Sequence, residues 1–211
     1  MPTINYAVTI SGLGGSIQRT TPRTGEGGIV AEVPLPAGKT GQLTTRTDNE
    51  TGTLTMSGGH GITTGAIIDL YWATGARFGI LVGTVATNSV PIGADNSGTG
   101  DNLPTNLTNV VASVQVPFNV AIDGDELGLV CLQNVYANNT ATDASRIGFL
   151  DGTNDPIASI KLTGNTPRVF DVEGGDSNPF TGDPITHAVA SNGSSSAASV
   201  LKIYGVQDAT P

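Results

Sequence analysis

The sequence predicts an all-β protein, an antiparallel β-sandwich of jelly-roll type with long Gly-, Asn- and Thr-rich loops; a barrel is the second choice. Short segments in which apolar and polar residues alternate recur along the chain. Glycine (29 residues) and proline (12 residues) supply frequent turns between these segments. Glu, Lys and Arg, which favour helices, are scarce, so helix is disfavoured nearly throughout.

Residues 1–27 are expected to form an N-terminal strand and an extended arm or loop. Apolar and polar residues alternate in INYAVTI (4–10), and a segment rich in Gly and Thr follows. Long connections of this kind are usually binding loops or disordered segments, so the arm is a candidate for function. Residues 28–211 are expected to form the β-sandwich, with a single domain in all.

Alternation predicts half-buried strands over 28–35, 41–47 and 52–58. The next two strand-like segments, AIIDLYW (66–72) and RFGILVGTV (77–85), are separated by a short turn containing glycine, which predicts a hairpin. Side chains alternate along a strand, so the first segment has a core face and an amphipathic face that is available to a subunit interface. The core face comprises Ile68, Leu70 and Trp72, and the amphipathic face comprises Ile67, Asp69 and Tyr71.

Residues 93–109 are expected to form a long surface loop, because they contain almost no bulky apolar side chains. Oxygen-bearing side chains at alternate positions and a glycine at the sixth position resemble a calcium-binding loop. The twelfth position is Asn106, where such a loop has a bidentate glutamate, and a plain Asx-rich turn explains the same residues. Calcium binding is therefore left open. The residues concerned are Asp95, Ser97, Thr99, Gly100 and Asp101.

Two further strands are predicted over 109–122 and 127–137, and the DGDE segment between them predicts a second hairpin. Asp123 and Asp125 flank Gly124, an arrangement that a hairpin turn explains without an acid/base pair. Three shorter strand candidates come next, at 146–150, 157–164 and 167–172. A third long loop (173–199) and a closing strand (200–207) follow them.

No catalytic, cofactor-binding or metal-binding residue is assigned, and enzymatic activity is not expected. Cys131 is the only cysteine and lies in an apolar run, which favours a buried, unreactive thiol. His60 lies in a Gly-rich turn, and His187 lies in the third loop near two carboxylates, too few ligands for a recognisable metal site. A hydrolase with paired carboxylates is the least favoured alternative. The two carboxylates near His187 are Asp176 and Asp183. The candidate catalytic pairs of a hydrolase are Asp123 with Asp125, or Asp151 with Asp155.

The net charge of −9 excludes some partners. An acidic protein repels phosphate backbones and anionic lipid surfaces, so direct binding to nucleic acid or membranes is not expected. The first residues lack the basic region of a secretory signal, and no segment approaches the length of a membrane span. Synthesis in the cytoplasm is therefore expected.

Residues 61–85, the following SVPIG (89–93) and GTGDNLP (98–104), and the closing SVLKIYGVQ (199–207) resemble virion structural proteins of tailed bacteriophages, in particular capsid decoration or cement proteins. This resemblance implies a β-rich protein, often a homotrimer, that binds the major capsid protein on the capsid surface and reinforces the head. It carries no functional residue over to this chain, and it implies no cofactor.

The alternative function is a receptor- or carbohydrate-binding module of a phage fibre or surface adhesin. Exposed aromatic rings would then stack on sugar rings, but aromatic residues make up only 5% of the chain. A major capsid subunit of the single jelly-roll type is a close structural relative of the main interpretation. The aromatic candidates are Trp72, Tyr71, Tyr136 and Tyr204.

Overall fold

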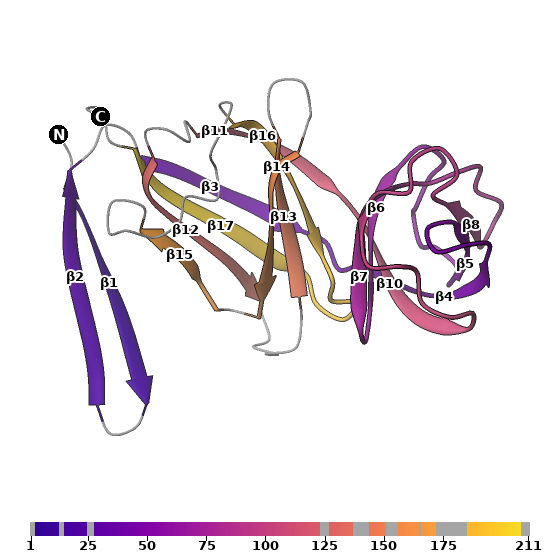
Figure 1. Ribbon diagram of the computed structural model, residues 1–211, viewed down its shortest axis with the longest axis horizontal. Coiled ribbons are helices and arrows are strands. Elements are labelled where there is room, and N and C mark those ends of the chain that lie inside the picture. The colour runs from indigo at the N-terminus through magenta and orange to yellow at the C-terminus, as the bar shows by residue number, and fades with distance from the viewer. Residues whose placement is uncertain are drawn as a thin grey trace.

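The computed structural model describes residues 3–12, 15–24, 28–122, 127–136, 144–150, 156–164, 166–171 and 185–207. All regular structure in these residues is β-strand, arranged in antiparallel sheets, which confirms the predicted all-β fold class. Figure 1 shows two lobes side by side and a hairpin beyond one of them. The hairpin pairs β1 (Thr3–Gly12) with β2 (Gly15–Thr24) as a sheet of its own.

The sandwich lobe consists of two four-stranded sheets, ordered β11-β16-β13-β14 and β15-β12-β17-β3, with a hydrophobic core between them. Val130, Leu132 and Phe149 are fully buried in this core. Alternate residues of each strand supply the core, as expected for facing sheets. The strands are β3 (Gly28–Leu35), β11 (Val116–Ile122), β12 (Leu127–Tyr136), β13 (Ala144–Leu150), β14 (Pro156–Thr163), β15 (Arg168–Asp171), β16 (Ile185–Asn192) and β17 (Ser199–Gln207).

The barrel lobe is a seven-stranded sheet, β8-β5-β4-β10-β6-β7-β9, that curls around a second hydrophobic core. Hydrogen bonds from Gly83 N to Pro91 O (2.9 Å) and from Gly93 N to Leu81 O (3.1 Å) join β8 to the end of β7. The sheet therefore curls back on itself, as in a barrel, which was the second choice of fold predicted from the sequence. The strands are β4 (Lys39–Arg46), β5 (Gly52–Met56), β6 (Ile67–Trp72), β7 (Gly75–Leu81), β8 (Ser89–Ile92), β9 (Thr99–Gly100) and β10 (Thr108–Val114).

The barrel lobe is inserted into the sandwich lobe between β3 and β11, and the expectation of one sandwich over 28–211 did not anticipate it. The predicted single strand over 109–122 is wrong, because it consists of β10 and β11, which separate at Gln115 and belong to different lobes. The predicted hairpin with 127–137 is also wrong, because β11 pairs with β16 whereas β12 pairs with β15 and β17. Alternation continues on both sides of Gln115, so the local pattern does not reveal the change of sheet.

Two of the predicted long loops contain strands. The expected loop over 173–199 includes β16, a central strand whose buried Ala188 and Ala190 are too small to give a strong hydrophobic signal. The expected loop over 93–109 includes β9 and the start of β10. The expected arm within 1–27 contains β2, so the arm is a hairpin.

The hairpin predicted over 66–85 is confirmed, because β6 pairs with β7. Ile68 and Leu70 are fully buried in the barrel core, and Trp72 packs against this core while remaining partly exposed. The opposite face of β6 is also largely covered, because Asp69 and Tyr71 are buried. Both bond to Ser191 of the sandwich lobe, so the face expected at a subunit interface contacts the other lobe of the same chain.

The substitution Phe149→Ala should lower the free energy of unfolding by about 3–5 kcal/mol, because truncation of a fully buried ring leaves a cavity. Leu107→Ala should change it by less than about 0.5 kcal/mol, because the Leu107 side chain is 67% exposed. Equilibrium unfolding in urea measures both effects. Similar effects of the two substitutions would contradict the assignment of Phe149 to the core.

Candidate binding cleft at the junction of the two lobes

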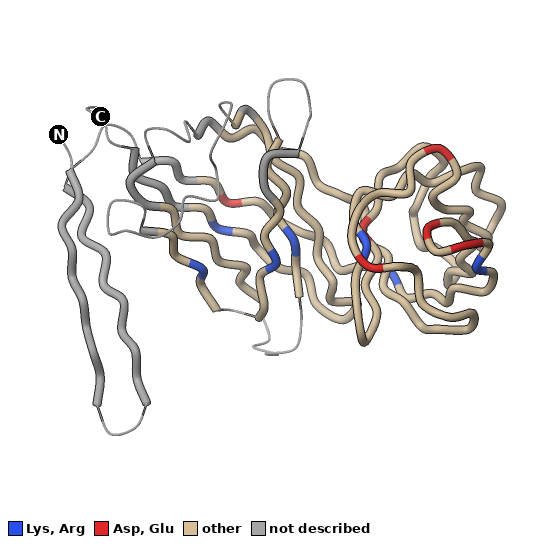
Figure 2. The backbone as a smooth tube through the Cα atoms, in the orientation of Figure 1, with Lys and Arg blue, Asp and Glu red and all other residues tan. Residues whose placement is uncertain are grey.

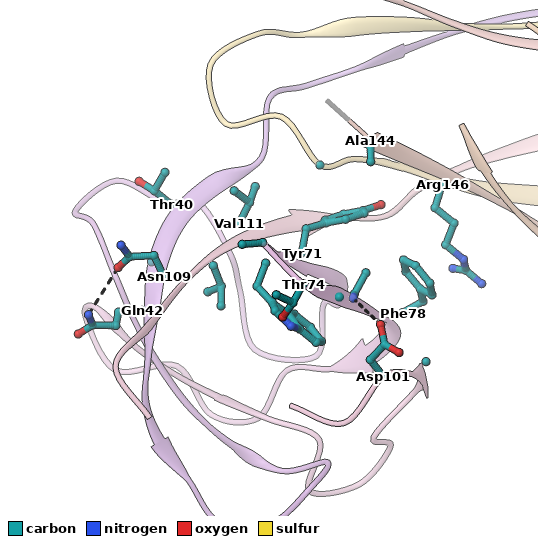
Figure 3. A pocket seen from close by; sticks show the side chains of 18 of the residues that line it. Thr40, Gln42, Tyr71, Thr74, Phe78, Asp101, Asn109, Val111, Ala144 and Arg146 are labelled. Atoms are coloured by element: carbon teal, nitrogen blue, oxygen red, sulfur yellow. Dashed lines mark hydrogen bonds between the residues drawn. The ribbon is translucent and has the colours of Figure 1, made fainter. Parts of the chain in front are cut away.

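A cleft of ≈ 1350 Å³ lies where the barrel lobe meets the sandwich lobe (Figure 3). One side is formed by β4, β5, β10 and the turn between β6 and β7, and the other by β13, β14 and the residue that follows β16. Because both lobes contribute to the lining, the relative position of the lobes determines the shape of the cleft.

The barrel side of the cleft has a polar wall on β4 and β10. Gln42 and Asn109 are direct partners in the antiparallel register, so they lie on the same face of the sheet. Gln42 Nε2 donates to Leu107 O (2.9 Å) and lies 3.5 Å from Asn109 Oδ1 (Figure 3). Their neighbours Leu43 and Val110 point into the barrel core, and this alternation turns the two amides toward the cleft.

The turn between β6 and β7 brings an aromatic ring and a carboxylate together. A Cβ atom on Gly75 would lie 2.8 Å from Trp72 Cζ2 and 2.6 Å from Asp101 Oδ2, so only glycine allows this close approach. Asp101 Oδ2 accepts a hydrogen bond from Ala76 N (3.0 Å), which fixes the carboxylate against the turn. Trp72 and Asp101 both line the cleft.

Behind the cleft lies a buried carboxylate with three hydrogen-bond donors. The Asp69 side chain accepts from Gly79 N (2.8 Å) and Gln115 Nε2 (2.8 Å) at Oδ1, and from Ser191 Oγ at Oδ2. Since the Ser191 hydroxyl proton is directed to Asp69, the Tyr71 hydroxyl donates to Ser191 Oγ (2.6 Å). This chain of bonds links β6 of the barrel lobe to β16 of the sandwich lobe.

Arg146 of β13 provides the opposite charge. Its Nη1 lies 3.6 Å from Asp69 Oδ1, and its Nε donates to Ser159 Oγ (2.8 Å). The guanidinium carbon lies 4.7 Å from the centre of the Phe78 ring, which adds a cation–π contact. Among the residues coloured in Figure 2, the sandwich lobe carries mainly cations and the barrel lobe mainly carboxylates. A buried ion pair adds little net stability, but removal of either partner is strongly destabilising because it leaves an uncompensated buried charge.

The network is structural rather than nucleophilic. Ser191 is only 1% exposed, so its hydroxyl is out of reach of a substrate. Burial, and secondly the charge of Asp69, raise the pKa of Tyr71 above its ordinary value, so the phenol stays protonated and keeps its role as donor.

The structure does not bring the cysteine and the histidines together. His60 belongs to the barrel lobe, where Nδ1 accepts from Ile62 N (3.0 Å) and Nε2 lies 3.0 Å from Thr87 O, so it stabilises a turn. Cys131 and His187 lie on different sheets of the sandwich, and His187 is on β16 rather than in a loop. Cys131 is half-buried rather than buried, and desolvation raises the pKa of its thiol, which disfavours the reactive thiolate.

The residues of the calcium-like pattern form other bonds. Ser97 Oγ donates to Glu50 Oε2 (2.9 Å), and Asn106 Oδ1 accepts from Arg46 N (2.6 Å). Among the described residues, no group of three or more His, Cys, Asp or Glu could hold a metal ion. The other candidate carboxylates lie outside the described residues; they are Asp123, Asp125, Asp151, Asp155, Asp176 and Asp183.

The aromatic residues do not form the stacking surface that the carbohydrate-binding alternative assumed. Tyr71 is 7% exposed and Tyr136 is 3% exposed, and the side chain of Tyr204 lies outside the described part of the structure. Of the four candidates, only Trp72 has a described, partly exposed ring at the cleft, where the partly exposed ring of Phe78 also lies. The sequence did not point to Gln42, Asn109 or the Arg146–Asp69 pair. The alternation of apolar and polar residues around them predicts strands, but it does not predict which strands lie side by side.

No family model, curated protein or solved structure matches the chain. The described residues contain no helix long and apolar enough to cross a membrane.

The substitution Arg146→Met should lower the free energy of unfolding by about 3–5 kcal/mol, because it leaves the Asp69 carboxylate buried without its countercharge. Adding Asp69→Asn should recover part of this loss, since the uncompensated charge is then removed. Lys202→Met is the control, because Lys202 and Glu32 form an exposed pair (2.9 Å) worth less than about 1 kcal/mol. Urea unfolding of Arg146→Met, Asp69→Asn and the double variant measures these changes in the free energy of unfolding. If the changes of the two single variants simply add up in the double variant, Asp69 and Arg146 are not coupled.

Stability should fall at high pH because of Tyr71. Because the pKa of Tyr71 is raised in the folded protein, its phenol ionises at a lower pH in the unfolded chain than in the folded one. The contribution of Tyr71 to stability is therefore complete below pH of about 10 and is lost progressively as the pH rises above this value. The free energy of unfolding should drop by up to about 1.4 kcal/mol per pH unit from this group alone. Comparing the wild-type slope above this pH with that of Tyr71→Phe isolates the effect, and identical slopes would refute it.

Proposed function

We propose that this chain is a non-enzymatic structural protein of a tailed-phage virion, which binds the outside of the capsid and stabilises it. Its partner is the major capsid protein, and its assembly is a homo-oligomer, with a trimer favoured. The resemblance of residues 61–85, 89–104 and 199–207 to capsid decoration proteins supports this proposal.

The observation that carries the proposal is the separate hairpin of β1 and β2, which forms a two-stranded sheet apart from both lobes (Figure 1). A two-stranded hairpin is only marginally stable in water without further packing. Its strands offer edges to which a neighbouring protein can add a strand. A partner that covers the hairpin would therefore stabilise it, and a capsid surface or a second subunit is suited to this role.

The charge of the hairpin segment supports an acidic partner surface. Residues 1–24 contain Arg19 and Arg23 and no Asp or Glu, whereas the whole chain has a net charge of −9. Opposite charges steer association and select partners. The segment is thus suited to the acidic surface of a second copy or of a capsid subunit.

The junction of the lobes supports a reinforcing role. Besides the Asp69–Arg146 pair, Gly38 N donates to Ser194 O (2.8 Å) and Asn192 N donates to Ser113 Oγ (3.2 Å), so several bonds cross or border the junction. A body whose parts are fixed to each other transmits force between its contacts instead of bending between them.

Deletion of residues 2–24 should abolish stable attachment to capsids, because it removes the hairpin. The experiment mixes the purified chain with empty capsids of the phage that encodes it, sediments the capsids and measures the bound fraction. Arg19→Gln with Arg23→Gln is the matched variant, which keeps the hairpin length and removes its positive charge. Light scattering on the free proteins gives the number of subunits.

Unchanged occupancy by the truncated chain would remove the hairpin from this account. Failure of the full chain to sediment with capsids would contradict the proposed function itself.

A further inference from the structure

We infer that the cleft at the junction of the lobes binds a neutral oligosaccharide. The inference stands on the cleft residues and is independent of the proposed attachment to a capsid.

The first argument is the pairing of an aromatic ring with a carboxylate. A sugar ring has an apolar face of C–H groups, which packs on aromatic rings, and an edge of hydroxyl groups, which donate to carboxylates. Trp72 remains partly exposed in the cleft, and Gly75 allows the Asp101 carboxylate to lie beside it. Asp101 Oδ2 is held by Ala76 N, and Oδ1 has no bond within the described residues and is available to a ligand.

The second argument is the amide wall on β4 and β10, which belongs to the same side of the cleft as Trp72. Gln42 uses Nε2 in its bond to Leu107 O, which orients the side chain and leaves Oε1 as an acceptor. Asn109 accepts at Oδ1, and its Nδ2 makes no hydrogen bond to another described residue. Ligand hydroxyl groups act as both donors and acceptors, so they match a wall that offers both. Thr40, Thr55 and Thr74 also line the cleft.

The third argument concerns charge. The only cations that line the cleft within the described residues are Arg146 and Lys161, and Arg146 is engaged by Asp69, Ser159 and the Phe78 ring. When the buried Asp69 is counted against Arg146 and the Asp101 carboxylate against Lys161, the formal charges at the cleft sum to zero, which leaves no excess positive charge for a phosphate or sulfate group. The net charge of −9 also opposes polyanions. These features favour a neutral ligand.

The fourth argument is size. Pockets for small ligands usually have volumes of about 300–1,000 Å³. The cleft, at ≈ 1350 Å³, is larger and lies between two lobes, so it has room for several linked sugar rings rather than one.

Trp72 makes the test direct, because it is the only tryptophan of the chain. Neutral gluco-, manno-, galacto- and chito-oligosaccharides are titrated into the full chain while the tryptophan fluorescence is recorded, and saturation-transfer NMR confirms contact. Polygalacturonate and heparin fragments serve as acidic comparators. We expect a saturable change with at least one neutral class and none with the acidic compounds.

Two substitutions link the signal to the cleft. Asp101→Asn keeps an acceptor for Ala76 N but removes the charge, and Asn109→Ala removes an amide; each should weaken binding by about tenfold or more. The matched controls are Asp95→Asn and Asn119→Ala, exposed residues that do not line the cleft, which should bind like the wild type. Circular dichroism verifies that each variant is folded.

No response to any neutral class would overturn the inference, as would binding that the cleft substitutions leave unchanged. Loss of capsid attachment in Asp101→Asn or Asn109→Ala, without oligosaccharide binding by the wild type, would instead identify the cleft as a protein contact. The chain lacking residues 2–24 should still bind the oligosaccharide, which separates this result from failure of the capsid proposal.

Discussion

The carboxylate of Asp69, buried between the lobes, is the constraint on which the arrangement of this protein depends. An isolated charge in such a place is strongly unfavourable, so the carboxylate requires both donors and a countercharge. The donors come from the barrel lobe and from Ser191, and the countercharge comes from Arg146 of the sandwich lobe. The observed position of the lobes satisfies all these groups at once.

That geometry also creates the cleft. The Arg146 side chain reaches across to Asp69 and the Phe78 ring, which brings β13 and β14 opposite the outer face of the barrel sheet. Gln42 and Asn109 then line a cleft whose other side is formed by the sandwich lobe. The two proposals use different parts of the molecule, because attachment rests on the β1–β2 hairpin and ligand binding rests on the lobe junction.

The lobes have separate cores, and this separation explains how one long chain accommodates an insertion. The barrel core is closed by the contact of β8 with the end of β7, and the sandwich core is closed by its two sheets. Only the stretches around Gly38 and Gln115 carry the chain between the lobes, and each lies in the hydrogen-bond network of the junction. The insertion therefore adds a lobe without breaking the sandwich core.

The sequence by itself determined the all-β class, most strand positions, the β6–β7 hairpin and the core face that contains Ile68 and Leu70, because alternation reports directly which side of a strand is buried. Only the tertiary structure decided that the chain changes lobes at Gln115, that β16 is a central strand, and that Asp69 meets Arg146. Alternation is a local signal that reports burial but not the identity of the neighbour. Sheet partners, ion pairs and the cleft depend on contacts between segments far apart in the chain, which no local pattern encodes.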